Sequence, residues 1–444
     1  MSETKLFAGY GPYRIDEAGL PYFNDVVWDF LDQRTMSAEE FGKLFGRLTR
    51  KNKQPYTKSR IYQMLRDNSF PDEKTRRWVL AKLLQIPPVL LGVSSLADLL
   101  PQAHHEQSLP IPTPSQAPPF ELKAYRQVLR RYMTNYTKTD REAEGTIDQR
   151  VANMEQEILY GTWSHLQRLQ IVQLLCQYHL MAAGIAWDQQ WYDAAVLRLN
   201  RAYQFAQNYE LADTQAAILF KRGSVFEAWG ASYKDKLDFA PAQRYLAWAR
   251  NDFLAAQSLE KYLYPGLQGH IQLYLGVISS HLATHPSQLH QAIVEIGKAE
   301  RFVGKDTARE DIYFVRLDEE RYQLSVASAY THAPTVIACY PKDARRALRN
   351  AWATRPTLTA QANREAFETI LLAKSYFLEK EYERATEQAY EALAQAAAVH
   401  SKENVARVAA LCDKLVLTDY GKKSVLVAEL DVAITMAQRP ELFQ

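Results

Sequence analysis

The sequence predicts an all-α protein in which a small helical bundle precedes a long array of paired helices. Three observations carry this prediction. Apolar residues recur with helical spacing along most of the chain, strand-like alternation and Asn-Gly or Asp-Gly hairpin turns are nearly missing after residue 125, and one proline-rich segment divides the two parts. The chain has 444 residues, of which 47% are hydrophobic and 23% charged, so it is long enough for two or three globular domains.

The clearest domain boundary is the segment 101–119, which contains six prolines among mostly polar residues. This composition is typical of an extended, semi-rigid linker. We therefore expect four parts. They are an N-terminal extension at 1–21, a small helical domain at 22–100, the linker at 101–119 and a larger helical domain at 120–444.

The small domain contains four short segments with apolar residues at helical spacing. Ser37 and Glu40 have the spacing of a capping box, which predicts the start of the second helix. Ile61, Met64 and Leu65 form the apolar stripe of the third. The expected helices lie near 26–31, 37–48, 57–67 and 71–84, with a short fifth segment at 89–91.

The positive charge of the chain is local, although the net charge of the whole is only +2. Residues 43–82 contain twelve basic and three acidic residues, a net charge of +9. Basic side chains that neutralise phosphates release counterions and so favour binding to nucleic acid. The block favours a DNA-binding face; a solvated face or a protein-docking surface is the alternative.

The stretches SAEEFGKLFGRL, TKSRIYQMLRDN and RRWVLAKLLQIPPVLLGV resemble the XRE-type, phage-repressor-like helix-turn-helix family over about residues 22–93. The resemblance implies that the first stretch is the supporting helix and the second the recognition helix. LTRKNKQPYT separates the two by more than the usual tight turn, so either the supporting helix is longer or the turn carries an insertion.

The candidate DNA-binding residues follow from this arrangement. On a helix that buries the Ile61, Met64 and Leu65 stripe, polar side chains face away and can enter the major groove, where Arg suits guanine and Gln suits adenine. Flanking basic residues would contact phosphates. The helix candidates are Thr57, Lys58, Ser59, Arg60, Tyr62, Gln63 and Arg66, and the flanking candidates are Arg50, Lys51, Lys53, Lys74, Arg76 and Arg77.

The larger domain contains a segment that resembles a tetratricopeptide repeat, with two helices between residues 364 and 396 joined at 379–381. The small and aromatic residues that match the pattern are Leu372, Ala373, Tyr376, Ala385, Ala389 and Ala392. A weaker copy has Ala182, Ala183, Ala186, Ala195, Leu199 and Ala202. We therefore expect an α-solenoid of tetratricopeptide-like helical hairpins.

The order of the two parts is similar to that of transcription regulators that respond to peptide pheromones. This resemblance implies a homodimer that binds double-stranded DNA and a peptide or protein effector bound by the repeats. The candidate effector-binding residues are Lys221, Gln272, Tyr274, Lys374 and Phe377. The alternative is a non-enzymatic protein-protein interaction scaffold, which salt-sensitive duplex binding would distinguish from a regulator.

We expect neither an enzyme nor a cofactor, because the sequence lacks the common phosphate-loop, nucleophile-elbow and dinucleotide motifs. His281, His285 and His290 could chelate zinc in principle, but the segment has no Glu between the first two and runs into a proline, so no metal site is predicted. Cys176, Cys339 and Cys412 are expected to be buried hydrophobes. No signal peptide or membrane span is expected, which predicts a cytoplasmic protein. The resemblance to the two regulator families implies that it is bacterial.

Overall fold

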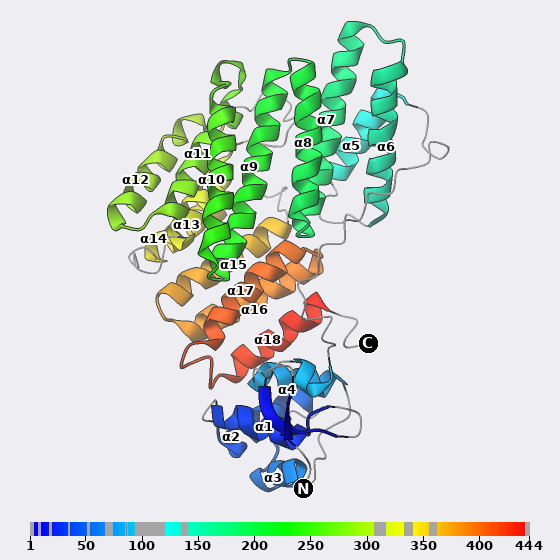
Figure 1. The fold of residues 1–444 in the computed structure, drawn as a ribbon. Coiled ribbons are helices and arrows are strands. Elements are labelled where there is room, and N and C mark those ends of the chain that lie inside the picture. The colour runs from blue at the N-terminus through cyan, green and yellow to red at the C-terminus, as the bar shows by residue number, and fades with distance from the viewer. Residues whose placement is uncertain are drawn as a thin grey trace. The chain divides into compact units, whose positions relative to one another are not determined.

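The structure is a computed structural model, and it describes residues 4–7, 10–16, 20–33, 36–50, 54–66, 74–84, 86, 88–93, 120–134, 141–305, 317–332, 341–354 and 362–439. Most of these residues belong to eighteen α-helices, and one two-stranded antiparallel sheet is the only sheet among them (Figure 1). The all-α class predicted from the sequence is confirmed.

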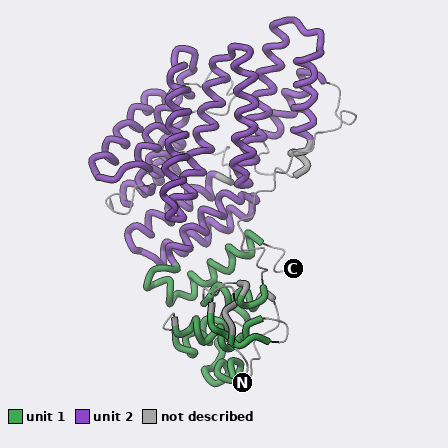
Figure 2. The backbone as a smooth tube through the Cα atoms, in the orientation of Figure 1, with its two compact units in different colours: residues 1–110, 416–444 green, residues 111–415 purple. Residues whose placement is uncertain are grey.

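The chain divides into two compact units (Figure 2). Unit 1 contains residues 1–110 together with 416–444, and unit 2 contains residues 111–415. The linker expected at 101–119 lies outside the described residues. The C-terminal residues thus group with the N-terminal bundle, whereas the sequence analysis assigned them to the larger domain.

Unit 1 contains a β-hairpin, four consecutive helices, a 3₁₀-helix and the last helix of the chain. Their bounds are β1 (Thr4–Phe7), β2 (Tyr10–Arg14), α1 (Phe23–Gln33), α2 (Ala38–Thr49), α3 (Lys58–Arg66), α4 (Lys74–Leu84), η1 (Pro88–Leu91) and α18 (Val425–Gln438). The helices agree closely with those expected. Ser37 accepts a hydrogen bond from the Glu40 backbone N–H and Glu40 accepts one from the Ser37 N–H, so the predicted capping box is present.

The hairpin was not anticipated in the expected N-terminal extension. It is tied to α1 by two side chains. The Tyr13 hydroxyl donates a 2.6 Å hydrogen bond to Asp29, and Arg14 forms a 2.5 Å ion pair with Asp25. Strands this short are set by such long-range contacts and not by their local sequence.

One apolar core fills unit 1. Phe41 and Phe45 of α2 stack with ring centroids 5.3 Å apart and are completely buried. Val425, Ala428 and Val432 of α18 pack against the same core. Lys82 of α4 and Asp431 of α18 add a salt bridge of 3.1 Å. The two ends of the chain therefore complete one fold.

Unit 2 contains thirteen of the α-helices and two of the described 3₁₀-helices. Their bounds are α5 (Leu122–Thr134), α6 (Arg141–Tyr160), α7 (His165–Asp188), α8 (Tyr192–Asn208), α9 (Ala212–Asp235), α10 (Phe239–Gln257), η5 (Glu260–Tyr262), α11 (Pro265–Leu282), α12 (Pro286–Gly297), η6 (Glu300–Phe302), α13 (Glu319–His332), α14 (Pro341–Thr354), α15 (Ala362–Leu378), α16 (Tyr382–Ala398) and α17 (Lys402–Val416).

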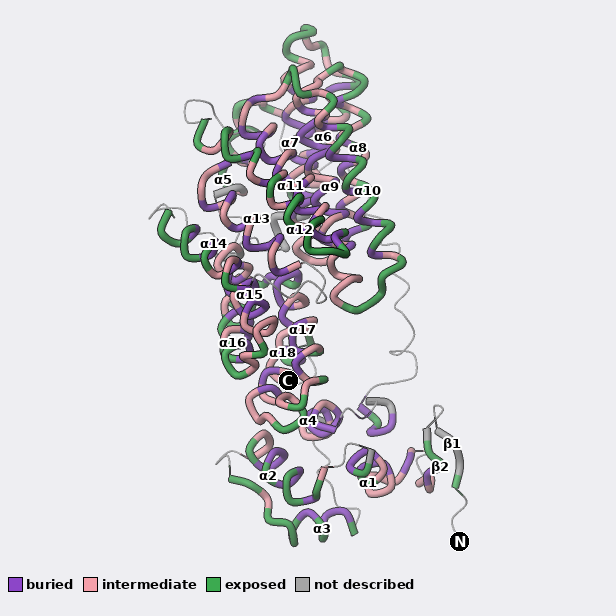
Figure 3. Tube along the Cα trace, turned by 90° about the vertical axis from the view of Figure 1, so that its left-hand side faces the viewer, coloured by how far each residue is buried: buried purple, intermediate pink, exposed green. Residues whose placement is uncertain are grey.

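Consecutive helices of unit 2 pack as pairs: α7 with α8, α9 with α10, α11 with α12, α13 with α14, and α15 with α16. The first helix of each pair also contacts the first helix of the next pair. We call α7, α9, α11, α13 and α15 the first-helix layer. Figure 3 shows that buried residues concentrate where these helices face their neighbours.

The same tight turn ends five helices of unit 2. In each turn one non-glycine residue adopts a left-handed conformation, with φ between 54° and 64°, and the next backbone N–H bonds to a carbonyl five residues earlier. These residues are Gln190, Glu210, Leu237, Lys380 and His400. This hydrogen-bond pattern satisfies the last carbonyls of a helix and reverses the chain. It explains why α15 ends at Leu378 and α16 begins at Tyr382, as predicted.

Small residues allow the paired helices to approach closely. Ala195, Leu199 and Ala202 of α8 are completely buried, as are Ala385, Ala389 and Ala392 of α16. Most of the repeat positions selected from the sequence therefore lie in the core between helices. Cys176 and Cys412 are buried, as predicted, and Cys339 lies outside the described residues.

One described helix, His165–Asp188, is long and apolar enough to cross a membrane. Two thirds of its apolar window, 67%, is buried inside the structure. This is the burial of a core helix, and it is compatible with a soluble protein.

Candidate functional sites

The connection between α2 and α3 packs closely on α2. Helix α2 ends at Thr49 and α3 begins at Lys58, so the length lies in the connection and not in a longer α2. The Tyr56 N–H donates a 2.9 Å hydrogen bond to the Gly42 carbonyl. A Cβ atom on Gly46 would lie 2.4 Å from the Tyr56 nitrogen. A glycine at 46 therefore lets the turn pack directly on α2.

The outer face of α3 carries the polar residues predicted for DNA contact. Thr57, Lys58, Ser59, Arg60, Tyr62, Gln63 and Arg66 are all exposed, whereas Ile61 and Leu65 are completely buried. Within the part of unit 1 that is described, neither Lys58 nor Arg60 forms a salt bridge. The Arg60 guanidinium donates a 3.1 Å hydrogen bond to the Gln63 side-chain oxygen, which aligns the two side chains on one surface.

The flanking candidates differ in their surroundings. The Arg50 guanidinium lies over the Tyr56 ring and donates a hydrogen bond to the Pro55 carbonyl. Arg76 is half-buried. Arg77 lies over the Phe23 ring and donates to the Leu91 carbonyl, contacts that hold α4 to the rest of the bundle. Lys51, Lys53 and the side chain of Lys74 lie outside the described residues.

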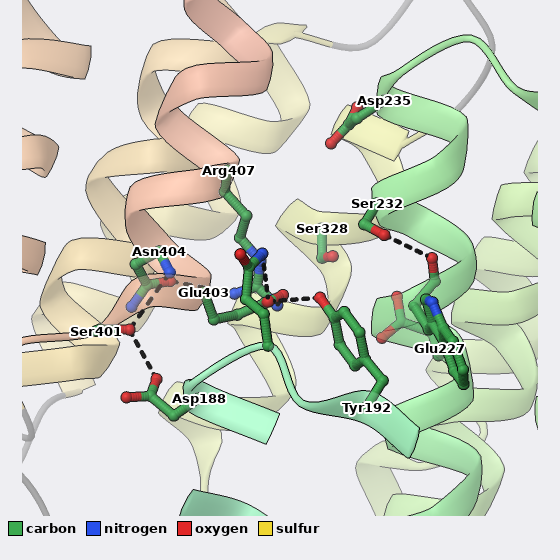
Figure 4. Close-up of polar contacts among 12 residues, drawn as sticks. Asp188, Tyr192, Glu227, Ser232, Asp235, Ser328, Ser401, Glu403, Asn404 and Arg407 are labelled. Carbon is green, nitrogen blue, oxygen red and sulfur yellow. Dashed lines mark hydrogen bonds and ion pairs between the residues drawn. The ribbon is translucent and has the colours of Figure 1, made fainter. Parts of the chain in front are cut away.

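Unit 2 contains a second concentration of polar groups, where the carboxyl ends of α7, α9, α11 and α13 meet α15 and α17. Figure 4 shows Glu403 and Arg407 of α17 facing Tyr192. The Tyr192 hydroxyl donates a 2.5 Å hydrogen bond to Glu403, and Arg407 forms a 3.0 Å ion pair with the same carboxylate. Ser401 donates to Asp188 at 2.7 Å, and burial raises the pKa of this carboxyl to about 6.

Asp235 is the centre of a triple ionic contact. Its carboxylate lies 3.0 Å from the Lys374 ammonium and 2.7 Å from that of Lys414. Burial acts to raise the pKa of Asp235, but the two lysines outweigh it and hold the pKa far below its usual range. The adjacent Lys234 donates to the backbone carbonyls of His281 and His332 at 2.6 and 2.9 Å. Burial lowers the pKa of Lys234 to about 8.

Two histidines and a glutamate lie beside this ionic contact. His281 Nε2 is 2.9 Å from a Glu227 oxygen, and the rings of His281 and His332 stack with centroids 4.4 Å apart. One potential ligand atom from each of the three residues lies within 4.8 Å of the others. Burial lowers the pKa of both imidazoles. These residue types can hold a metal ion, and no such group was predicted from the sequence.

The structure brings three of the five candidate effector-binding residues into this polar region. Lys374 pairs with Asp235, and the Lys221 ammonium lies 4.7 Å from the Trp187 ring centroid. Burial lowers the pKa of Lys221 to about 8, and the charge of Arg321 contributes. Burial likewise raises the pKa of Tyr274 to about 12, against the pull of the Arg321 charge. Lys221 and Tyr274 therefore lie within electrostatic reach of the same arginine.

The other two candidates lie elsewhere. Gln272 donates to the Glu295 side chain at 3.1 Å, and the Phe377 ring packs 5.7 Å from that of Tyr382. Both contacts join neighbouring helices.

Sequence reasoning missed most of the polar region. The residues that were missed come from three helices that are far apart in sequence, so no motif within a short segment could bring them together. They are Glu227 and Asp235 of α9, His332 of α13, and Glu403 and Arg407 of α17. The one available signal was a charged residue between apolar neighbours on a helix, as at Glu227 between Phe226 and Ala228. Such a residue is rarely buried without a partner.

No known protein-family model matches the sequence, and no curated protein matches it.

Proposed function

We propose that this protein is a sequence-specific DNA-binding transcription regulator, in which α2 and α3 form a helix-turn-helix and α3 enters the major groove. The observation that carries the proposal is the division of α3 into two faces. Ile61 and Leu65 are buried in the core, while the polar residues listed above are exposed together on the other side. A helix with this division presents hydrogen-bonding groups to base edges without losing its packing.

The chemistry of the exposed face suits duplex DNA. Arg60 can donate two hydrogen bonds to guanine, and Gln63 can both donate to and accept from adenine. Their mutual hydrogen bond in the absence of DNA keeps the two side chains on one surface. The local net charge of +9 supplies the attraction to phosphates. A single module of this size contacts few base pairs, so we propose a homodimer that binds paired half-sites.

Unit 2 would act as the sensor, as a tetratricopeptide-like solenoid that binds a peptide or protein effector. Supporting this role, Lys221 is partly buried, and no carboxylate in the described residues forms a salt bridge with it. Keeping a partly buried ammonium without a counter-ion costs free energy, and such perturbed groups are common at binding sites. An acidic group of the effector, such as a peptide carboxylate, would supply the missing charge. Such a regulator would work in the cytoplasm, where its DNA lies.

The decisive experiment is selection of random-sequence duplexes by the full-length protein, followed by sequencing. We expect a paired motif, and an affinity that falls steeply as salt rises. Arg60→Ala and Gln63→Ala should each lose about 1–3 kcal/mol of discrimination at one position of the motif. Arg384→Ala, an exposed arginine of α16, is the matched control and should bind as the wild type does.

Absence of duplex binding at low salt would contradict the proposal. It would favour an interaction scaffold, in which unit 1 docks a protein.

A further inference from the structure

Three metal-ligand side chains meet near the carboxyl ends of helices in the first-helix layer. Glu227 comes from α9, His281 from α11 and His332 from α13. The side chain of His281 is only 1% exposed and that of Glu227 13%. Side chains from three successive helices thus converge on one partly buried point.

We propose that Glu227, His281 and His332 bind one divalent transition-metal ion, and that zinc is the ion these ligands suit best. Two imidazole nitrogens and one carboxylate oxygen form a donor set that zinc uses in proteins. Calcium and magnesium prefer all-oxygen sites. This inference goes beyond the proposed function and does not depend on whether unit 1 reads DNA.

The geometry requires only small side-chain movements. Three atoms that all lie within 4.8 Å of one another are at most about 2.8 Å from a common centre. Zinc–nitrogen bonds are about 2.0–2.1 Å long, so each atom needs to move by at most about 0.7 Å. His281 Nδ1 is buried without a hydrogen-bond partner. Hydrogen bonding therefore restrains the ring only at Nε2, through Glu227, while the ring also stacks on His332.

Neighbouring groups already orient the ligands. The Ser328 hydroxyl lies 2.9 Å from His332 Nδ1 and can accept a hydrogen bond from Nδ1–H, which leaves Nε2 free to ligate a metal. Lys234 binds the backbone carbonyls of both histidines and holds the ends of α11 and α13 together.

The nearby charges are mixed: Asp235 pairs with Lys374 and Lys414 and offsets one of their two positive charges, and Glu227 supplies a second carboxylate among the ligands themselves. The charge of Lys234 is directed at the two carbonyls. Three protein ligands leave a fourth tetrahedral position for water or for a group of a bound effector. Binding the ion would link three successive helices of the first-helix layer.

The test uses full-length protein stripped of metal with a chelator. Zinc is titrated by calorimetry, and cobalt is titrated in parallel because its visible absorption reports tetrahedral coordination. We expect one equivalent per chain. His281→Ala, His332→Ala and Glu227→Gln should each weaken binding by more than about 100-fold, and Ser328→Ala by about 10-fold, since outer-shell changes typically cost 10- to 100-fold.

His285→Ala and His290→Ala are the matched controls, because both histidines are exposed and follow His281 closely in sequence. Circular dichroism and thermal melting of each apo variant separate loss of ligation from loss of folding. Retained one-to-one binding in the folded Glu227, His281 or His332 variants would overturn the proposal. Absence of stoichiometric binding by the wild type, or loss of binding in the His285 and His290 controls, would overturn it as well.

Discussion

The Asp235 carboxylate lies 3.0 Å from the Lys374 ammonium, although 139 residues separate them in sequence. The contact joins the end of α9 to the middle of α15, and the carboxylate also binds Lys414 of α17. The single negative charge of Asp235 on α9 therefore interacts with lysines on two other helices, α15 and α17. Because all three side chains are mostly shielded from water, removal of the carboxylate leaves both lysines without compensation.

Asp235→Asn should destabilise unit 2 strongly. The change leaves the two lysines facing each other without a counter-ion, and breaking a buried ion pair typically costs about 3–5 kcal/mol. Chemical denaturation followed by circular dichroism measures the loss. The double variant Asp235→Asn with Lys374→Met should recover part of it. A loss below about 1 kcal/mol, the value typical of surface pairs, would contradict this account.

Lys221→Met should stabilise the protein at neutral pH. The folded-state pKa of Lys221 is about 8, below the ordinary value of 10.5, because burial penalises the ammonium. Because the unfolded chain binds this proton more tightly than the folded chain, the stability of the wild type is highest above pH 10.5, where Lys221 is neutral in both states. That stability is lost as the pH falls through 8, where the folded protein must carry the charge. The free energy that corresponds to the full pKa shift is an upper limit for two reasons. The lysine side chain keeps some contact with water, and the substitution removes its contact with Trp187. We therefore expect a gain of about 1–2 kcal/mol at pH 7.

Melting curves of wild type and Lys221→Met between pH 7 and 10.5 test this sign. The stability difference should shrink as the pH rises. The same variant should lose affinity for acidic peptide effectors if Lys221 binds a carboxylate. A constant difference across the range would show that desolvation of the ammonium is not its cause.

Gly46→Ala should disrupt the connection between α2 and α3. The added methyl group would lie 2.4 Å from the Tyr56 nitrogen and 2.7 Å from the Gln54 carbonyl oxygen, both backbone atoms that cannot rotate away. We expect a loss of about 2 kcal/mol or more, within the range for overpacking, together with weaker duplex binding. Gly297→Ala is the matched control, because a Cβ there meets no atom within 4 Å. Equal melting temperatures for the two variants would contradict the close packing at Gly46.

Lys380→Gly should stabilise unit 2. Lys380 is exposed and has a φ of 62°, a conformation that costs residues with a Cβ atom about 1–2 kcal/mol. Glycine removes this strain but gains freedom in the unfolded chain, so the net gain should be about 0.5–1 kcal/mol. Lys380→Ala keeps the strain and serves as the control. A gain of similar size with alanine would indicate that the lysine charge, and not the backbone, is responsible.

Much of the helical content followed from local sequence. The apolar stripe of Ile61, Met64 and Leu65 predicted both the third helix and the exposed residues opposite it. Ser37 and Glu40 predicted where α2 begins. These signals are local because a helix satisfies its backbone hydrogen bonds within itself, and its cap lies within one turn.

The signals failed where structure depends on contacts with distant residues. The hairpin of β1 and β2 is held by bonds from Tyr13 and Arg14 to α1. Nothing in the last helix indicated that it completes the core of unit 1, since an apolar face does not specify its partner. Gln272 and Phe377 were chosen by position along a helix, and their contacts are with neighbouring helices.

The sequence by itself determined the class of fold, the approximate boundaries of α1 to α4 and of the α15–α16 pair, and the exposed basic face of α3, because helical periodicity and charge are properties of short segments. The tertiary structure alone decided the polar region of unit 2. Glu227, His281 and His332 lie on three helices, and Asp235 finds its partners on two others. Their chemistry arises from proximity in space, which no spacing along the chain encodes.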